Sequence, residues 1–244
     1  MNTSDILTIT KRKTRFLQKK LSGNYKHFKK DIKIKSEWHG NLYGGFYLSP
    51  RFINENSIVY SFGIGEDLSF DRSISDRFGC EVNCFDPTPK SLKWIAKQSP
   101  SILKNLKIFD YGLSRHTQTA TFFLPKNSNN VSGSIVSQSA VNPDDSIQVE
   151  LKSINDIVRE LGHDNVDVLK MDIEGAEYDF INGLSEHSIR PKQLLIEFHD
   201  RLFPDEPNIT KDAIECLRNN GYLLFNVSDI FEEASFVHTS IVDP

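Results

Sequence analysis

Cysteine is scarce in this sequence, with three residues among 244. Cys80 and Cys84 are too far apart for a Cys-x-x-Cys pair and Cys216 stands alone, so we expect neither a disulfide framework nor a zinc cluster. Long apolar runs are missing too: no segment approaches the roughly 18 residues that cross a bilayer, and no apolar signal core precedes the first lysines. We therefore expect a cytoplasmic protein that is neither membrane-spanning nor secreted.

Positive charge is concentrated in the first segment of the chain. The formal net charge is −4, but residues 1–37 contain eleven lysines and arginines against three acidic residues, so they carry +8 and the remainder carries −12. We predict a basic N-terminal extension at 1–37 and a domain at 38–244. Because an acidic domain binds nucleic acid poorly, we expect no nucleic-acid partner.

The basic extension could make three kinds of contact: with an anionic membrane surface, with another polyanion, or with the acidic domain itself. The simplest interpretation is a solvated leader whose apolar side chains dock on the domain, and these are Phe16, Leu17, Leu21 and Phe28.

Short apolar runs alternate with helical patterns from residue 57 onward. The sequence predicts strands at 57–62, 81–85, 106–109, 119–124, 147–151, 166–171, 193–198, 222–227 and 236–242. It predicts helices at 67–78, 89–98, 154–161 and 210–220 and another from Ala176, with Ser153 and Thr210 as N-caps. This order is typical of an α/β fold with a mainly parallel sheet covered on both faces, and the final hairpin adds an antiparallel edge strand.

A glycine-rich turn follows the first of these strands. Gly63 and Gly65 allow the backbone to approach a ligand closely. Asp86 comes 21 residues after Gly65, at the end of the next strand, which is the spacing at which a carboxylate accepts both hydroxyls of an adenosine ribose. These features fit a dinucleotide or S-adenosylmethionine, or a purely structural turn.

The residues beside the glycines distinguish the two ligands. A dinucleotide fingerprint has a small residue where this sequence has Leu68, and the carboxylates of Glu66 and Asp67 would repel a pyrophosphate. A ligand with an ammonium and a sulfonium group would be attracted instead. The sequence favours S-adenosylmethionine, and a nicotinamide-dependent oxidoreductase is the alternative.

The segment 166–178 places charged residues at the end of an apolar strand. Lys170 and Asp172 share one face of the strand, so Asp172 should emerge at its carboxyl end. Burying Lys170 is costly unless a carboxylate meets it, and Glu174, Glu177 or Glu197 could do so.

The run Lys170–Glu177 resembles the KxDxEGxE signature of the FkbM family of S-adenosylmethionine-dependent methyltransferases. The resemblance extends in order over about residues 40–230, through the segments 59–67, 85–89, 111–114 and 195–199. It implies a three-layer, Rossmann-like class I methyltransferase fold, with a seven-stranded, mostly parallel sheet whose last strand is antiparallel. It also implies methyl transfer to hydroxyls of sugars or natural products. Ser61 departs from the family, which commonly has an acidic residue there, and Glu66 or Asp67 could replace it at the donor's amino end.

The donor-binding residues that we predict are Ser61, Gly63, Ile64, Gly65, Asp67, Asp86, Pro87, Asp110, Tyr111, Asp172 and Glu174. Within this set, Asp110 could accept the adenine amino group and Tyr111 could stack on the ring, or both could simply belong to a surface loop. Tyr43, Phe46 and Tyr47 could cover the donor pocket or face a sugar, although ordinary packing is the simpler interpretation.

For catalysis, we predict His199 as the base that takes the hydroxyl proton, with Asp172 orienting it or the acceptor; the two roles could be reversed. We also include Lys170 and Glu197 among the catalytic candidates, and Glu197 could either form a structural ion pair with Lys170 or take a direct part. We assign no metal site, although Asp172, Glu197 and His199 could together bind a divalent cation.

The predicted function is therefore O-methyl transfer from S-adenosylmethionine to a small-molecule or glycan acceptor, the sugar being implied by the resemblance alone. The serine- and asparagine-rich loop 125–145 and the segment 201–207 would form the acceptor side. A second alternative is a non-catalytic binding module, for which Ser61 is the only indication.

Overall fold

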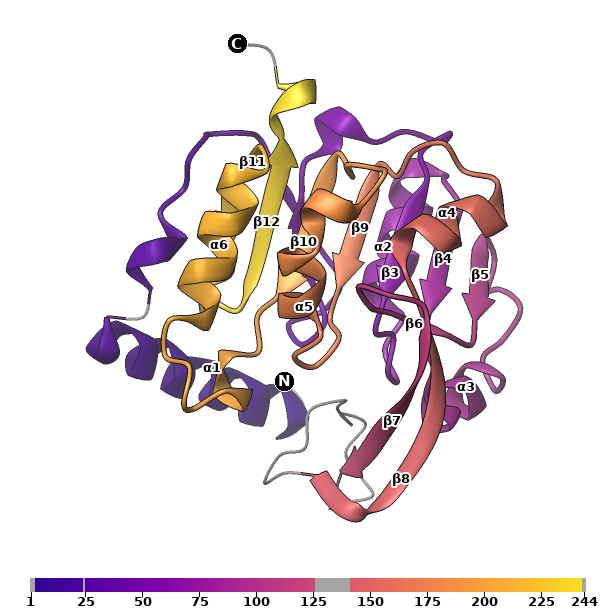
Figure 1. Ribbon diagram of the computed structural model, residues 1–244, viewed down its shortest axis with the longest axis horizontal. Helices are drawn as coiled ribbons and strands as arrows, with labels where there is room; N and C mark the ends of the chain where they lie inside the picture. Colours follow the sequence, from indigo (N-terminus) through magenta and orange to yellow (C-terminus); the bar gives the residue numbers. More distant parts are fainter. Residues whose placement is uncertain (1–2, 24, 126–140, 243–244) are drawn as a thin grey trace.

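The computed structural model describes residues 3–23, 25–125 and 141–242, and its centre is a seven-stranded sheet (Figure 1). In spatial order the strands are β11 (Tyr222–Val227), β12 (Glu233–His238), β10 (Gln193–Glu197), β9 (Val168–Met171), β3 (Val59–Phe62), β4 (Val82–Phe85) and β5 (Leu106–Phe109). Neighbours from β10 to β5 are parallel, and β12 is antiparallel to both β10 and β11. The predicted α/β fold with a mostly parallel sheet is confirmed.

The last strand of the chain, β12, does not lie at the edge of the sheet, where we predicted it. We expected the final hairpin to add an antiparallel strand at the edge, but the edge strand is β11, and the antiparallel β12 lies inside it. The helix before β11 (Ile209–Asn219) crosses from β10 to the edge of the sheet, so that a gap one strand wide remains between β10 and β11. The returning β12 fills that gap and pairs with a neighbour on each side.

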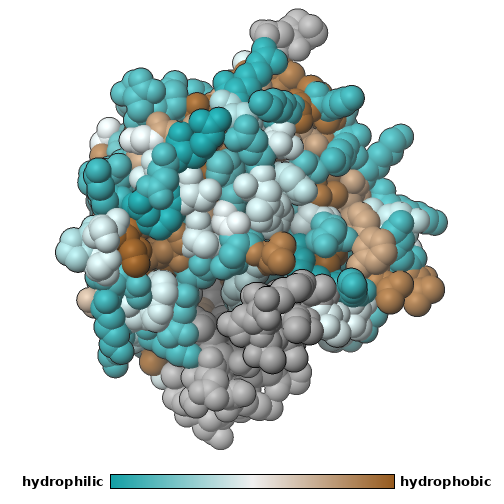
Figure 2. All heavy atoms as spheres, turned by 180° about the vertical axis from the view of Figure 1, so that it is seen from behind, coloured by the Kyte–Doolittle hydropathy of each residue, from teal (hydrophilic) through white to brown (hydrophobic). Residues whose placement is uncertain are grey.

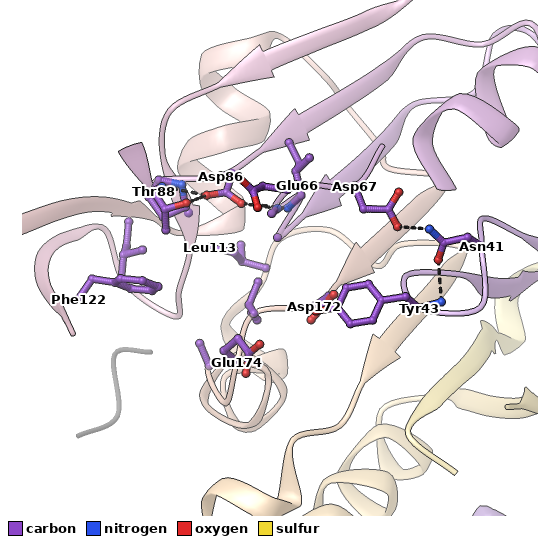
Figure 3. A pocket seen from close by; sticks show the side chains of 18 residues that line it. Asn41, Tyr43, Glu66, Asp67, Asp86, Thr88, Leu113, Phe122, Asp172 and Glu174 are labelled. Carbon is purple, nitrogen blue, oxygen red and sulfur yellow. Dashed lines mark hydrogen bonds between the residues drawn. The ribbon is translucent and has the colours of Figure 1, made fainter. Parts of the chain in front are cut away.

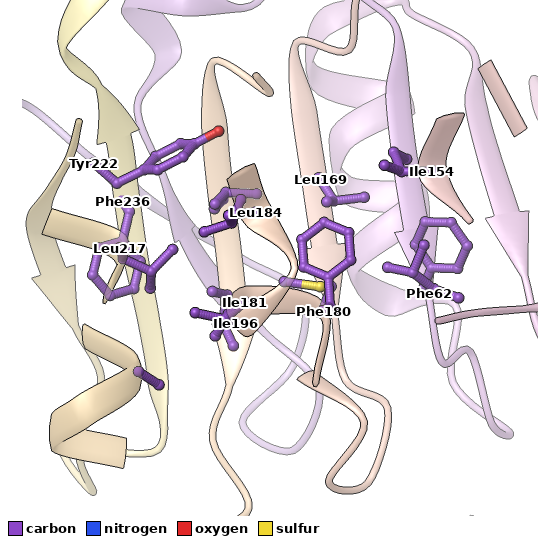
Figure 4. Close-up of a cluster of buried hydrophobic side chains, with 14 of the residues drawn as sticks. Phe62, Ile154, Leu169, Phe180, Ile181, Leu184, Ile196, Leu217, Tyr222 and Phe236 are labelled. Carbon is purple, nitrogen blue, oxygen red and sulfur yellow. The ribbon is translucent and has the colours of Figure 1, made fainter. Parts of the chain in front are cut away.

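One face of the sheet is covered by three helices, α4 (Ile154–Leu161), α5 (Glu177–Asn182) and α6 (Ile209–Asn219). They contribute side chains such as Phe180 and Leu217 to a large apolar cluster shared with the strands (Figure 4). Because the strands between them are buried on both faces, they lack polar alternation, as the sequence pattern indicated.

The opposite face carries α2 (Ser69–Phe78), α3 (Pro89–Ile95) and a small hairpin of β1 (Glu37–His39) and β2 (Phe46–Leu48). A second apolar cluster, which includes Ile74, fills the space between these elements and the sheet. Short 3₁₀ helices complete the described chain at Lys26–Phe28, Pro50–Phe52, Leu184–Glu186, Asp200–Leu202 and Thr239–Ile241.

A separate three-stranded sheet, at the lower right of Figure 1, consists of β6 (Gly112–Leu113), β7 (Gln118–Pro125) and β8 (Val141–Lys152). The two strands predicted here are confirmed, and they pair antiparallel. Our expectation of a loop over 125–145 was wrong at its ends, because Pro125 and residues 141–145 belong to β7 and β8. Residues 126–140 lie outside the described chain.

Two predicted helix caps have different outcomes. The Ser153 hydroxyl accepts a hydrogen bond from the Asp156 amide at 3.2 Å and caps α4 as predicted. The cap predicted at Thr210 was wrong, since α6 begins at Ile209 and the buried Thr210 hydroxyl instead lies 2.9 Å from that of Tyr178.

The N-terminal extension forms helix α1 (Thr3–Ser22), which packs against the loops at one end of the sheet. Phe16 stacks near Phe231, as predicted for an apolar anchor, and Phe28 is buried. Leu17 and Leu21 were predicted to dock as well, but they are 58% and 88% exposed because they lie on the outer side of the helix. None of the described helices is both long and apolar enough to cross a bilayer.

Several basic side chains of α1 contact acidic groups of the domain. Arg12 pairs with Asp229 at 2.5 Å and with the buried Glu233 at 3.2 Å, and Arg15 pairs with Glu232 at 2.7 Å. Of the three contacts considered for the extension, the one with the protein's own acidic surface is thus present. Contact with a membrane or another polyanion stays a prediction.

Apolar groups are dispersed over the surface. Seen from behind, most of the molecule is polar and apolar residues form separate spots (Figure 2). The exposed large apolar side chains among the described residues are Leu17, Leu21, Leu42, Tyr43 and Ile102. Scattered apolar residues are ordinary on protein surfaces, and of these five Tyr43 lines the pocket described below.

The strand order reverses between β3 and β9, so a ligand crevice is expected where these two strands end. At that point Gly63 has φ +76°, and a Cβ placed on it would come within 1.7 Å of the carbonyl oxygen of Asp172. Glycine is therefore required for two reasons, its backbone conformation and the close approach of the two chains.

A matched pair of substitutions separates these two reasons. Gly162 has φ +69°, but a Cβ placed on it would meet no atom within 4 Å, so Gly162→Ala should cost about 1 kcal/mol, from conformation alone. Gly63→Ala should cost about 3 kcal/mol more, because the strand ends must separate. Urea unfolding of both variants measures the difference, and equal losses would contradict the close contact.

Candidate functional site

A pocket of about 450 Å³ opens at the carboxyl ends of β3, β4 and β9 (Figure 3). The residues that line it are Asn41, Tyr43, Gly63, Ile64, Gly65, Glu66, Asp67, Asp86, Pro87, Thr88, Gly112, Leu113, Phe122, Leu151, Asp172, Ile173, Glu174 and Ala176. The glycine turn, Asp86 and Asp172 therefore surround a single cavity, as the sequence pattern predicts. The volume lies within the range of about 300–1,000 Å³ that is typical of small-molecule sites.

Asp86 joins two walls of the pocket. One of its oxygens accepts hydrogen bonds from the amides of Ile64 at 3.1 Å and Gly65 at 2.8 Å. The other accepts from the amide and the hydroxyl of Thr88 at 2.9 and 2.6 Å. A ribose hydroxyl would have to share or replace these donors, so the predicted ribose contact stays a prediction, while the anchoring of the glycine turn is observed.

The turn between β1 and β2 forms the rim of the pocket. The Asn41 amide donates to Asp67 at 2.8 Å, and its oxygen accepts from the backbone of Tyr43 at 2.6 Å. Asp67 also accepts from the amide of Ser69, which explains why α2 begins at Ser69 rather than at Asp67 as predicted. The Tyr43 ring points into the pocket (Figure 3).

The pocket is strongly acidic. Its described lining contains five carboxylates, those of Glu66, Asp67, Asp86, Asp172 and Glu174, and it includes no lysine, arginine or histidine. Such a wall attracts cationic groups and repels a pyrophosphate. Leu113, Phe122 and Leu151 supply an apolar side, which suits a flat ring.

His199 lies next to this pocket without lining it. The side chain is 1% exposed; Nδ1 is 3.1 Å from a Glu177 carboxylate oxygen, which also accepts from the His199 amide at 2.9 Å. Nε2 is 3.5 Å from Asp172, 3.5 Å from Glu174 and 3.6 Å from Glu197.

The surrounding charges set the protonation of this cluster. Burial by itself would lower the pKa of His199, but the carboxylate of Glu177, followed by those of Glu197 and Glu174, raises it to about 10. Burial, together with the Asp172 carboxylate, raises the pKa of Glu197 well above its ordinary value. The surrounding carboxylates therefore favour the protonated form of His199.

Lys170 has a different role from the one predicted. It is buried, and its Nζ donates to the backbone oxygens of Gly63 at 2.6 Å and Phe62 at 3.2 Å. The nearest carboxylate is that of Asp172 at 3.9 Å, not Glu174, Glu177 or Glu197, because Lys170 points toward β3. The ion pair proposed between Lys170 and Glu197 is thus not formed, and Lys170 ties β9 to the glycine turn.

Three predicted donor residues lie away from the pocket. Ser61 is fully buried inside β3, with its side chain on the α2 side of the sheet. Asp110 is exposed, and the buried Tyr111 ring lies under the Lys152 ammonium at 4.0 Å. The adenine contacts assigned to Asp110 and Tyr111 stay predictions, and the next two residues along the chain are the ones that line the cavity.

Sequence reasoning missed several lining residues. Gly112 and Leu113 belong to the segment 111–114 that carried the family resemblance, so a signal for them existed. Thr88 follows Pro87, which was predicted, and Asn41 lies two residues before Tyr43, which was considered. Phe122 and Leu151 come from β7 and β8, and no local pattern indicates that this small sheet closes one side of the pocket.

Known proteins resemble this chain over much of its length. Residues 50–224 match the family described as the methyltransferase FkbM domain. The human protein named probable methyltransferase-like protein 24 is 27% identical over 168 residues, which cover 66% of this chain and 38% of the human one. The 2-O-methyltransferase NoeI of Sinorhizobium fredii is 24% identical over 157 residues, covering 59% of this chain and 64% of NoeI.

Among solved structures, the methyltransferase FkbM of Methylobacillus flagellatus superposes with a TM-score of 0.50 at 15% identity. The superposition covers 79% of this chain and 47% of that one, and it shows a shared fold. The chain spans less than two thirds of the length of each of these three proteins.

Replacing Asp86 tests its anchoring role. Asp86→Ala leaves buried amides of the glycine turn without an acceptor, so the free energy of unfolding should fall by at least about 2 kcal/mol. Affinity for S-adenosylhomocysteine, measured by calorimetry, should fall about tenfold or more. Asp110→Ala is the control and should change neither quantity appreciably; weakened binding in that variant would instead support the adenine contact predicted from the sequence.

Proposed function

Because the chain belongs to the FkbM family of methyltransferases, whose methyl donor is S-adenosylmethionine, we propose that it methylates a hydroxyl oxygen of a sugar or glycan. The resemblance identified in the sequence is confirmed by the match over residues 50–224. The observation that carries the proposal is the convergence of the glycine turn and the carboxylates of three strand ends on one pocket.

The pocket fits this donor in size and charge. The glycine turn would face its amino acid portion, with Glu66 and Asp67 supplying the negative charge that Ser61 does not. Leu113, Phe122 and Leu151 would contact the adenine ring. These placements support S-adenosylmethionine over a nicotinamide dinucleotide, whose pyrophosphate would meet the acidic wall.

When bound, S-adenosylmethionine supplies an electrophilic methyl carbon: an acceptor oxygen bonds to it while the carbon–sulfur bond breaks and its electron pair remains on sulfur. The chain must hold the acceptor in line and receive its hydroxyl proton. Asp172 lines the pocket with a side chain that is 23% exposed, whereas His199 is enclosed by carboxylates. The reversed assignment, with Asp172 as the base and His199 behind it, is therefore the one we propose.

The sugar acceptor rests on two supports. NoeI, a relative at 24% identity, is named a 2-O-methyltransferase. At the pocket mouth, the exposed Tyr43 ring and the Asn41 amide offer a flat apolar face and a hydrogen-bonding group, which suits a polyhydroxylated ring.

Ligand-dependent melting distinguishes the two donor classes. S-adenosylhomocysteine at a hundred times its Kd should stabilise the protein by about 2.7 kcal/mol and raise Tm by roughly 5–10 °C. NAD at equal concentration should leave Tm unchanged because of the acidic wall. A shift with NAD and none with S-adenosylhomocysteine would revive the oxidoreductase alternative.

Turnover tests the reaction and the base. Incubation with S-adenosylmethionine and a panel of mono- and oligosaccharides should yield an O-methylated sugar detectable by mass spectrometry. Asp172→Asn should slow kcat by about 10²–10⁴-fold with little change in S-adenosylhomocysteine affinity. Asp164→Asn, an exposed carboxylate in the loop before β9, is the control and should be fully active. Full donor affinity without transfer to any hydroxyl would favour a non-catalytic binding module.

A further inference from the structure

Asp172 and Glu174 line the pocket, His199 lies directly behind them, and each of the three brings one ligand atom to the same point. Asp172 and Glu174 follow β9, and His199 follows β10. Their ligand atoms all lie within 4.8 Å of one another, and the imidazole Nε2 is 3.5 Å from an oxygen of each carboxylate. Two atoms bound to one ion at about 2.1 Å, at angles of 90–120°, are about 3.0–3.6 Å apart, so these nitrogen-to-oxygen separations match shared coordination.

His199 is the observation that points to a ligand. Its Nε2 is buried and has no hydrogen-bond partner among the described residues, although it faces three carboxylates. Its other nitrogen, Nδ1, is 3.1 Å from Glu177, whose carboxylate is completely buried. Metal-binding histidines typically donate their second N–H to a carboxylate in this way, which turns the Nε2 lone pair toward the ion.

Further charged groups surround this point. Glu197 adds a further carboxylate at 3.6 Å from Nε2. The cations nearby approach from the periphery: Lys170 lies 3.9 Å from the other oxygen of Asp172, and Arg201 lies 3.4 Å from Glu174. A divalent cation between the carboxylates and Nε2 would neutralise them at the centre of the cluster.

We propose that Asp172, Glu174 and His199 bind a divalent metal ion, with Glu197 beside it as a further ligand or a hydrogen-bond acceptor for metal-bound water. The set combines one imidazole nitrogen with carboxylate oxygens. It suits Mn²⁺ better than Mg²⁺, because Mg²⁺ prefers oxygen ligands alone. From the sequence we assigned no metal site and considered only Asp172, Glu197 and His199 as possible ligands. This proposal replaces that assignment and adds Glu174 as a ligand.

The position of this ion deepens the proposed function and rests on it. Asp172 and Glu174 line the pocket, so an ion held between them and His199 faces the cavity. It would take the acceptor hydroxyl as a further ligand and lower the pKa of its proton, which then passes to a carboxylate of the cluster. A substrate with two neighbouring hydroxyls, as a sugar has, could bind the ion through both oxygens.

Electron paramagnetic resonance with Mn²⁺ tests the site directly. The full chain, freed of metals with a chelator and then dialysed, is titrated with MnCl₂, and the signal of free Mn²⁺ is followed. A single saturable site per chain is expected at micromolar Mn²⁺. Absence of saturable binding up to millimolar Mn²⁺, with and without S-adenosylhomocysteine, would mean that the cluster holds only a proton and would overturn the proposal.

Matched variants locate the ion. Glu174→Gln should weaken Mn²⁺ binding at least about tenfold, since a neutral amide replaces an anionic ligand. Glu66→Gln removes a carboxylate from the same pocket but outside the cluster, and Mn²⁺ affinity should stay within about twofold if ligand contacts rather than the general acidity of the pocket determine it. Equal losses in the two variants would refute the site.

Spin-echo modulation identifies the nitrogen ligand. The Mn²⁺ complex should show coupling to one imidazole nitrogen, and this coupling should vanish in His199→Gln. Circular dichroism and cooperative melting establish that each variant is folded. Bound Mn²⁺ without nitrogen coupling in the wild-type protein would contradict ligation by His199.

Failure of this inference differs from failure of the proposed function. Methyl transfer that persists at full rate in excess chelator would reject the role of the ion and leave the methyltransferase intact. Mn²⁺ bound at His199 in a protein that methylates no hydroxyl would keep the site and reject the proposed reaction.

Discussion

The close contact between the ends of β3 and β9 is the constraint on which the whole site depends. A Cβ at Gly63 would come within 1.7 Å of the Asp172 carbonyl oxygen, and the Asp172 amide donates to Phe62 at 3.1 Å. Lys170, which belongs to β9, strengthens this contact because its Nζ donates hydrogen bonds to the carbonyl oxygens of Phe62 and Gly63 at the end of β3. The glycine turn and the acidic floor are therefore one rigid unit, and a buried lysine that looked catalytic is explained by its part in holding that unit together.

The acidic residues of the pocket divide by what holds them. The carboxylate oxygens of Asp86 and Asp67 accept hydrogen bonds from backbone amides and from Asn41. These two residues therefore mainly fix the conformation of the turns. Asp172 and Glu174 instead face the cavity on one side and His199 on the other. The walls of the pocket are thus anchored by hydrogen bonds to backbone amides, while the carboxylates of the floor lie beside His199.

The sequence predicted those features that depend on neighbours along the chain. Strand ends, the cap at Ser153 and the joint pocket of Gly63, Asp86 and Asp172 followed from local patterns and from the rule that ligands bind at the carboxyl ends of parallel strands. Contacts between distant segments were out of reach. Glu177 and His199 lie 22 residues apart in the chain, and they meet because β9 and β10 pair in parallel and end at the same edge of the sheet. No local pattern tells whether Lys170 turns toward β3 or toward Glu197.

The basic extension contacts the segments that hold His199 beside the acidic floor of the pocket. Arg15 pairs with Glu232, whose backbone oxygen accepts from the Phe198 amide, directly before His199. Lys19 lies 3.4 Å from Asp200, directly after it, and donates to the carbonyl of Phe231 at 3.0 Å. Helix α1 therefore contacts the segments on both sides of His199, and its positive charge lies against acidic residues of those segments. The opposite charges of the two parts are arranged so that the extension stabilises the backbone on which the acidic cluster is built, since partly buried pairs are screened less by salt than exposed ones.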